Sequence, residues 1–337
     1  MAKSFREAVL TFAWMQWNDL GVFASAENPD AWCHDVEALL IFTLEVGRRD
    51  PRVFDEIQDW LCLNVRWLSI QRLRNLLRPH PESVARLVGA ALAIASEEAR
   101  SPSAAPKLDQ REPEPLFGSL SEHDLTDWEP DAIFFRFGFR RPRFVRSYKS
   151  KPPDPLRPSN FALRLRAVFG AGTRSEALRY LVLMGGERCT MAEVAHDAAF
   201  SKRKVQDALS DLAAAGVCER IKRGNEYLWA VPMARWLAFL GAAKRDLPSW
   251  MDWQAIFRGL SLVWRFLDEA RGQSNRYLLA SDARRVMAEA APLLRGLHGW
   301  KPTEGADLPG ELYLDAFSRD LEAVIALLRR GRARAAR

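Results

Sequence analysis

The chain has 337 residues, of which 48% are hydrophobic and 27% are charged. This balance is typical of globular proteins, excludes wholesale disorder and collagen-like repeats, and at this length predicts two or three domains. No apolar run approaches the roughly 20 residues that span a bilayer, and Arg6 and Glu7 lie where a signal peptide would be apolar. The four cysteines form no C-x-x-C pair. We therefore expect a cytoplasmic protein with no membrane contact, no metal and no cofactor.

Basic residues are concentrated in the later part of the chain. Residues 1–98 and 99–131 have net charges of −4 and −5, whereas residues 132–160, 161–231 and 232–337 have net charges of +7, +3 and +5. Positive charge that begins abruptly and continues along the chain favours a polyanionic partner, with nucleic acid as the first candidate. The alternative is an ordinary solvated surface.

The first 98 residues predict an N-terminal helical domain. Apolar side chains recur at helical spacing throughout residues 1–98, and Gly21 and Gly47 end two of the runs. Residues 99–131 are rich in proline and acidic side chains. This composition predicts an extended linker that buries too little apolar surface to become ordered.

Residues 132–160 form a basic arm rich in phenylalanine and arginine. The two residue types are interleaved between positions 134 and 146, and the local alternation favours a strand or a hairpin. Cations interleaved with aromatic rings suit a nucleic-acid backbone and its bases, so Arg140, Arg141 and Arg143 are candidate DNA contacts. The alternative is an arm whose rings pack on the protein while its arginines stay in water.

Residues 161–235 carry the clearest signal. The segment Thr173-Arg174-Ser175-Glu176 fits a capping box at the start of one helix, and Thr190 with a glutamate three residues later fits another at the start of a short helix. Ser201 then caps a third helix, which Gly216 ends. Two segments that alternate in polarity follow and flank Gly224-Asn225, which predicts a β-hairpin.

This order of elements is that of a winged helix-turn-helix. The segment TMAEVAHDAAFSKRKVQDALSDLAAAGVCERIKRGNEYLWAV resembles the DNA-binding core of bacterial winged-helix transcriptional regulators of the broad MarR/ArsR kind. The resemblance is confined to residues 161–231. It implies a recognition helix that begins at Ser201 and enters the major groove, and a hairpin wing that touches the backbone or the minor groove. The candidate DNA contacts on these two elements are Ser201, Lys202, Arg203, Lys204, Gln206, Lys222, Arg223 and Asn225.

Two residues depart from the pattern of that family. Ala199 lies at the turn between the two helices, where such motifs often have glycine. Asp207 lies on the expected recognition face, where a basic or polar side chain is commoner; it would accept from a cytosine amine or restrain Arg203. Both departures bear on how the turn and the recognition face are built.

Residues 236–337 predict a C-terminal helical region. Its last helix, expected at residues 312–330, carries a narrow apolar seam of the kind that pairs with a partner helix. A homodimer through the C-terminal helices is therefore one expectation, and an ordinary helix bundle within the chain is the other.

The sequence thus predicts a mainly α protein with an N-terminal helical domain, a central winged helix-turn-helix with a β-hairpin wing, and a C-terminal helical bundle. The five histidines are dispersed, and no P-loop, G-x-S-x-G or H-E-x-x-H motif is present, so we do not expect an enzyme. The expected function is that of a DNA-binding transcriptional regulator, a repressor, that binds double-stranded DNA. The alternative is an interaction protein, such as an antitoxin-like or regulatory partner of a neighbouring enzyme, whose winged helix contacts a protein or serves autoregulation.

Overall fold

The computed structural model describes residues 1–22, 32–98, 112–118, 129–297, 300–303 and 308–330. These ranges contain fourteen α-helices and five short strands, so the prediction of a mainly helical protein is confirmed. No helix in the described part of the chain is both long enough and apolar enough to cross a membrane.

Most helices belong to one helical body, which we define as α1–α5 and α12–α14. Its central helix is α2 (Val36–Gly47), in which every residue is buried. A helix that is apolar on most sides is stable only when neighbours cover it on all faces. Its neighbours are α1 (Ala2–Asp19), α3 (Pro51–Asn64), α4 (Ile70–Leu77), α5 (Glu82–Glu98) and α12 (Trp253–Glu269). Helix α13 (Arg276–Leu294) packs on α12, and α14 (Tyr313–Arg330) packs on α1 and α13.

The C-terminal helices complete the core that the N-terminal helices begin. The ring of Phe42 on α2 stacks on Phe257 of α12 with a centroid distance of 4.7 Å. The apolar seam of α14, with Leu321, Val324 and Leu328 buried, packs within the same core, and α14 lies against α1. The expected N-terminal and C-terminal units therefore share one core, and the seam expected to pair with a second copy is used inside the chain.

The linker and the arm differ from their predictions. Residues 99–111 and 119–128 of the expected linker lie outside the described residues, but within residues 112–118 the side chains of Leu116 and Phe117 are buried. In the arm, Asp131 caps the short helix α6 (Ala132–Arg136) by accepting from two backbone N–H groups. The two-residue strand β2 (Phe139–Arg140) then pairs in parallel with β1 (Glu114–Pro115). The expected strand is therefore found only over Phe139–Arg140, whereas residues 132–136 form one helical turn that this cap favours.

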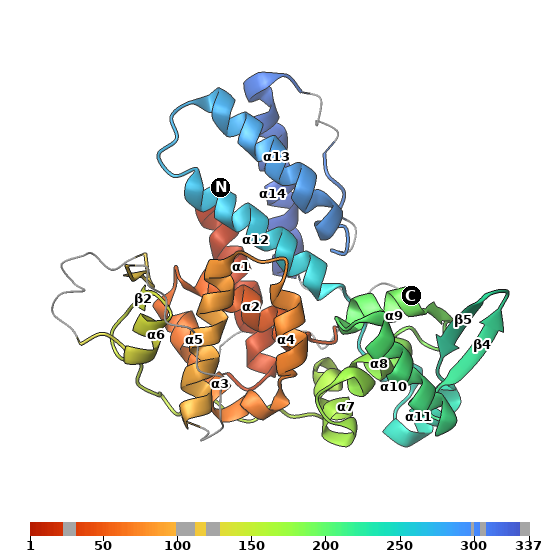
Figure 1. Ribbon diagram of the computed structural model, residues 1–337. Helices are drawn as coiled ribbons and strands as arrows, with labels where there is room; N and C mark the ends of the chain where they lie inside the picture. The colour runs from red at the N-terminus through yellow and green to blue at the C-terminus, as the bar shows by residue number, and fades with distance from the viewer. Residues whose placement is uncertain (23–31, 99–111, 119–128, 298–299, 304–307, 331–337) are drawn as a thin grey trace.

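A second core lies in residues 161–240, which we call the module. Its elements are α7 (Phe161–Phe169), α8 (Thr173–Leu183), β3 (Cys189–Thr190), α9 (Met191–Ala198), α10 (Lys202–Ala214), β4 (Glu219–Arg223), β5 (Glu226–Ala230) and α11 (Met233–Leu240). The strands form an antiparallel sheet in the order β3-β5-β4. Figure 1 shows that the module projects to one side of the body, with the β4–β5 hairpin at its far end.

Candidate nucleic-acid interface

Two capped helices form the centre of the module. The Thr190 hydroxyl accepts a hydrogen bond from the backbone N–H of Glu193, and the Glu193 carboxylate accepts in return from the Thr190 N–H at 2.7 Å. Ser201 caps α10 by accepting from the N–H of Lys204. Both predicted caps are confirmed. Between the two helices, Ala199 adopts φ +55°, a left-handed conformation that costs a residue with a Cβ about 1 kcal/mol.

Helix α10 has one apolar and one polar face. The apolar face packs into the module through Val205, Leu209 and Leu212, which are all buried. The opposite face leaves Lys202, Arg203, Lys204 and Gln206 exposed within the first two turns. Asp207 is also exposed on this helix. The first turn therefore presents three cations and no acid to solvent.

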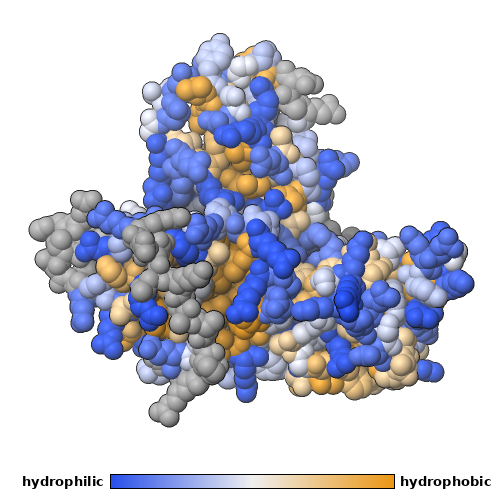
Figure 2. All heavy atoms as spheres, in the orientation of Figure 1, coloured by the Kyte–Doolittle hydropathy of each residue, from blue (hydrophilic) through white to orange (hydrophobic). Residues whose placement is uncertain are grey.

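The hairpin adds further cations at the end of the module. Lys222, Arg223 and Asn225 are exposed. Gly224 between them adopts φ +60°, which favours glycine. Arg220 lies over the Tyr227 ring at 4.3 Å, so the same strand pair also presents an exposed cation on an aromatic ring. In Figure 2 the side chains at this end of the molecule are mostly hydrophilic.

The basic arm lies elsewhere. Figure 1 places α6 and β2 on the side of the body away from the module. Arg141 is buried, and its guanidinium donates to both carboxylate oxygens of Asp55 at 2.7 and 3.1 Å. Arg140 is half-buried, and Arg143 alone of the three candidates is fully exposed. Arg141 therefore cannot reach a phosphate, and its inclusion among the DNA contacts is corrected.

Buried rings explain why Arg141 is held in this position. Its guanidinium lies 5.2–5.9 Å from the centroids of four phenylalanine rings, which suits cation–π contact. The four rings belong to Phe54, Phe117, Phe134 and Phe144. The rings of the arm thus pack on the protein, as the alternative expects, but Arg141 is buried among them and does not stay in water.

The most unusual feature of the molecule is a cluster of buried charges between the body and the module. It was not predicted from the sequence. We call it the interface ion network; each of its members is at most 6% exposed. Its members are the carboxylates of Asp35, Glu37, Glu176 and Asp197 and the guanidiniums of Arg72, Arg166 and Arg179.

Arg166 joins the two parts of the molecule directly. From α7 it donates to Glu37 of α2 at 2.7 and 2.8 Å and to Glu176 of α8 at 2.7 and 2.9 Å. It also donates to the backbone carbonyl of Trp67 at 2.6 Å. Burial raises the pKa of Glu176, but Arg166, Arg72 and Arg179 outweigh that effect and hold the pKa at about 2. Glu176 is therefore ionised at neutral pH.

Arg72 connects α4 of the body to the turn before α10. It donates to both carboxylate oxygens of Asp35 at 2.6 Å, and its Nε donates to the carbonyl of Ala198 at 3.2 Å. Although burial acts to raise the pKa of Asp35, Arg72 holds it well below its usual range. On the other side of the turn, Asp197 pairs with Arg179 and accepts from the indole N–H of Trp250 at 2.7 Å. The network thus fixes the position of the α9–α10 turn relative to the body.

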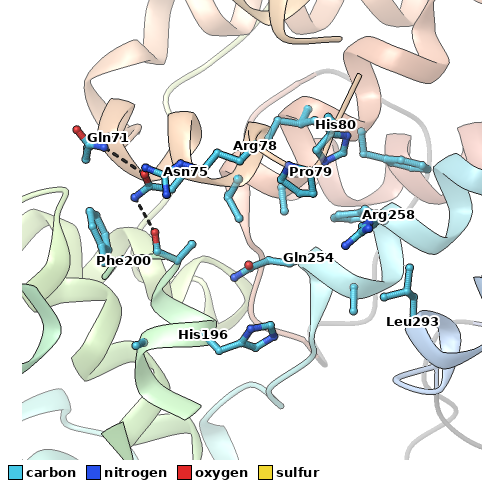
Figure 3. Close-up of a pocket in the computed structure, with 18 of the residues that line it drawn as sticks. Gln71, Asn75, Arg78, Pro79, His80, His196, Phe200, Gln254, Arg258 and Leu293 are labelled. Atoms are coloured by element: carbon cyan, nitrogen blue, oxygen red, sulfur yellow. Dashed lines mark hydrogen bonds between the residues drawn. The ribbon is translucent and has the colours of Figure 1, made fainter. Parts of the chain in front are cut away.

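A cavity of about 510 Å³ lies beside this turn. Figure 3 shows its lining, which comes from α4, α9, α12 and the chain around them. Asn75 donates to the carbonyl of Ala199 at 2.8 Å, and Gln254 donates to that of Asp197 at 2.6 Å. Lys204 of α10 also lines the cavity. The cavity is therefore in contact with the residues that position α10.

Comparison with known proteins identifies no family for this chain. No family model, no curated protein and no solved structure matches the chain. Within the described ranges, no group of three or more His, Cys, Asp and Glu side chains is placed to hold a metal ion. The function must therefore be argued from the geometry of the module and its surroundings.

Proposed function

We propose that this protein is a DNA-binding transcriptional regulator that contacts duplex DNA with α10 and the β4–β5 hairpin. The observation that carries the proposal is the polar face of α10, where Lys202, Arg203 and Gln206 are exposed beside the capped helix start. Donors in the first turns of a helix suit phosphates and base edges in the major groove. The other face of the same helix is buried, so its orientation is fixed.

The arrangement of elements supports a winged helix-turn-helix. Helices α8, α9 and α10 precede the hairpin, and the strand order β3-β5-β4 places the hairpin beside them. In winged-helix regulators of the MarR/ArsR kind, which residues 161–231 resemble, the third helix reads the groove and the hairpin touches the backbone. Lys222, Arg223 and Asn225 would have that role here.

Repression is the mode that requires least of this protein. A protein that occupies a promoter blocks polymerase by its bulk alone, whereas activation needs a specific contact to polymerase.

The DNA-binding site that we propose comprises the exposed residues of α10 and the hairpin. It excludes the buried Arg141, and Arg143 would be a separate contact only for DNA that bends around the body.

The test is quantitative DNA binding with matched variants. A preferred duplex is selected from a random pool, and affinity for it and for random DNA is measured by fluorescence anisotropy at two salt concentrations. Arg203→Ala should cost about 1–3 kcal/mol on the selected duplex and little on random DNA, whereas Lys222→Ala should weaken both equally. Arg235→Ala, at an exposed position on α11, is the control. Equal losses on both duplexes for Arg203→Ala would refute base reading, and salt-independent binding would refute the whole proposal.

A second candidate, a module that contacts a protein, is favoured by one observation. Phe239 and Val168 are 60% and 56% exposed on the α7 and α11 side of the module. Trp236 and Phe169 line a small groove beside them. Exposed apolar surface of this kind marks interaction sites. This second function requires a partner protein. If no duplex is selected, Phe239→Ser should abolish binding of that partner.

A further inference from the structure

The cavity between the body and the α9–α10 turn has an unusual electrostatic character. Arg78, Lys204 and Arg258 line it, and no carboxylate does. None of these three cations has an ion pair with a described residue, whereas each buried arginine of the interface ion network is paired with carboxylates. Cations that converge on a hollow without a counter-charge create a positive potential there.

A histidine also belongs to this cavity. Burial, together with the charges of Arg265 and Arg258, lowers the pKa of His80 to about 4. His80 is therefore neutral at pH 7 and adds no charge, but its ring lines the cavity.

Part of the cavity lining is apolar. It is formed by Ile41, Phe42, Leu76, Phe200, Phe257 and Leu293. Phe42 and Phe257 are stacked on each other with an interplanar angle of 15° and are almost completely buried. A phosphate of the DNA backbone would gain nothing from such walls, whereas an apolar body would.

From these observations we propose that the cavity binds a small organic anion, with its charged group at Arg78 and Arg258 and its apolar body against the apolar part of the lining. The volume of about 510 Å³ lies within the roughly 300–1,000 Å³ that small-molecule sites have. It is too small for a folded partner. Figure 3 shows Arg258 and Gln254 from α12, His196 from α9 and Asn75 from α4 around the common space.

Occupancy of the cavity would act on α10. Asn75 and Gln254 line the cavity and hold the carbonyls of the α9–α10 turn, while Lys204 contributes to both the cavity wall and the first turn of α10. An anion that draws Lys204 inward removes a cation from the exposed face. This regulatory consequence rests on the proposed function, whereas binding of the anion does not.

Binding is tested with a fluorescent probe of matching chemistry. The probe is 1-anilinonaphthalene-8-sulfonate, and its uncharged counterpart N-phenyl-1-naphthylamine has the same rings without the anion. The intact protein should bind the sulfonate with one-to-one stoichiometry and the neutral compound at least tenfold more weakly. Inorganic phosphate, which has charge but no apolar body, should compete only weakly. Equal affinity for the charged and uncharged probes would overturn the proposal.

Matched variants locate the probe. Arg78→Gln and Arg258→Gln remove exposed cations from the lining, so the fold is preserved, and each should weaken sulfonate binding about tenfold. Ala255→Phe, on α12, should block the cavity from another wall. Arg203→Gln, next to Lys204 but outside the lining, is the control and should leave binding unchanged. Unchanged affinity in the Arg78→Gln, Arg258→Gln double variant would place the probe elsewhere and refute the site.

The same variants separate this inference from the proposed function. Arg203→Gln should lose DNA affinity and keep the probe, whereas Arg258→Gln should keep DNA affinity and lose the probe. If no DNA binds but the probe behaves as expected, the anion site stands and the proposed function fails. If DNA binds and the probe shows no dependence on charge, the anion site fails and the proposed function stands.

Discussion

Replacing Arg166 by methionine tests whether the interface ion network stabilises the molecule. The guanidinium donates five hydrogen bonds, to Glu37, Glu176 and the Trp67 carbonyl, and all are lost in the variant. Methionine has a similar length and is apolar, so the cavity it leaves is small. The network would then hold four carboxylates against two guanidiniums in a site closed to water.

The magnitude follows from the burial of the charges that remain. Glu37 keeps Arg72 and the Ser69 N–H, and Glu176 keeps Arg72 and Arg179, so neither carboxylate is fully stranded. Breaking a buried pair by removing one partner costs about 3–5 kcal/mol. We expect Arg166→Met to lower the free energy of unfolding by about this amount, and Glu37→Gln in the same chain to restore part of it because it removes one uncompensated charge.

The assay is urea denaturation followed by tryptophan fluorescence at pH 7, since the chain has 12 tryptophans. The matched control is Arg174→Met, in an ion pair with Asp211 at 2.6 Å whose side chains are 56% and 62% exposed. An exposed pair contributes less than about 1 kcal/mol, so this variant should resemble the wild type. If Arg166→Met is no more destabilising than Arg174→Met, the network does not hold the module to the body.

Three further predictions concern local features. Thr190→Ala should lower the free energy of unfolding by about 1 kcal/mol through loss of the cap, and no change in the urea midpoint would contradict the capping geometry. Leu116→Ala should cost about 2–5 kcal/mol because that side chain is fully buried, whereas a solvated linker would show no effect in the same titration. Because Arg166, Arg72 and Arg179 outweigh the raising effect of burial and hold the pKa of Glu176 at about 2, its contribution to stability is complete above its unfolded pKa of about 4.3 and is lost as the pH falls toward 2. Urea titrations at about pH 6, 4 and 3 should show this decline. In Arg166→Met it should be smaller, because loss of the Arg166 charge raises the pKa of Glu176 in the folded state toward its unfolded value; identical acid limbs would contradict the assignment.

Features that depend on neighbours in sequence were predictable. The caps at Thr190 and Ser201 and the hairpin around Gly224 follow from a few adjacent residues, and the structure has all three. The prediction of a capping box that begins at Thr173 is wrong. Gly172 is the cap, and Glu176, which fitted the box, turns inward to Arg166 instead.

The interface ion network depends on contacts between distant parts of the chain, which periodicity does not reveal. Glu37 and Arg166 are 129 positions apart, yet their side chains meet at 2.7 Å. One signal was present: Glu37 stands in a run of otherwise apolar residues, and a helix buried on all sides has no solvent face for a carboxylate. A charge in such a run requires a buried partner, although the sequence does not say which.

In the arm, by contrast, a clear sequence pattern was present but predicted the wrong structure. Its alternation of phenylalanine and arginine fits a strand, but Asp131 directs one helical turn and the rings of four phenylalanines surround Arg141. The sequence pattern of a cation among aromatic residues is the same whether the cation contacts a nucleic acid or the protein's own rings. Only the position of Asp55 on α3 decides between the two.

The packing of α14 against α1 has a consequence for biosynthesis. These helices lie at residues 2–19 and 313–330, so the body joins segments that are synthesised at widely separated times. The module between them makes its own core from consecutive elements and completes it on the ribosome while the body still lacks α12–α14. Until residues 253–330 have been synthesised, α1 and α2 therefore lack the helices that cover part of their apolar surface, whereas the module already has its own core.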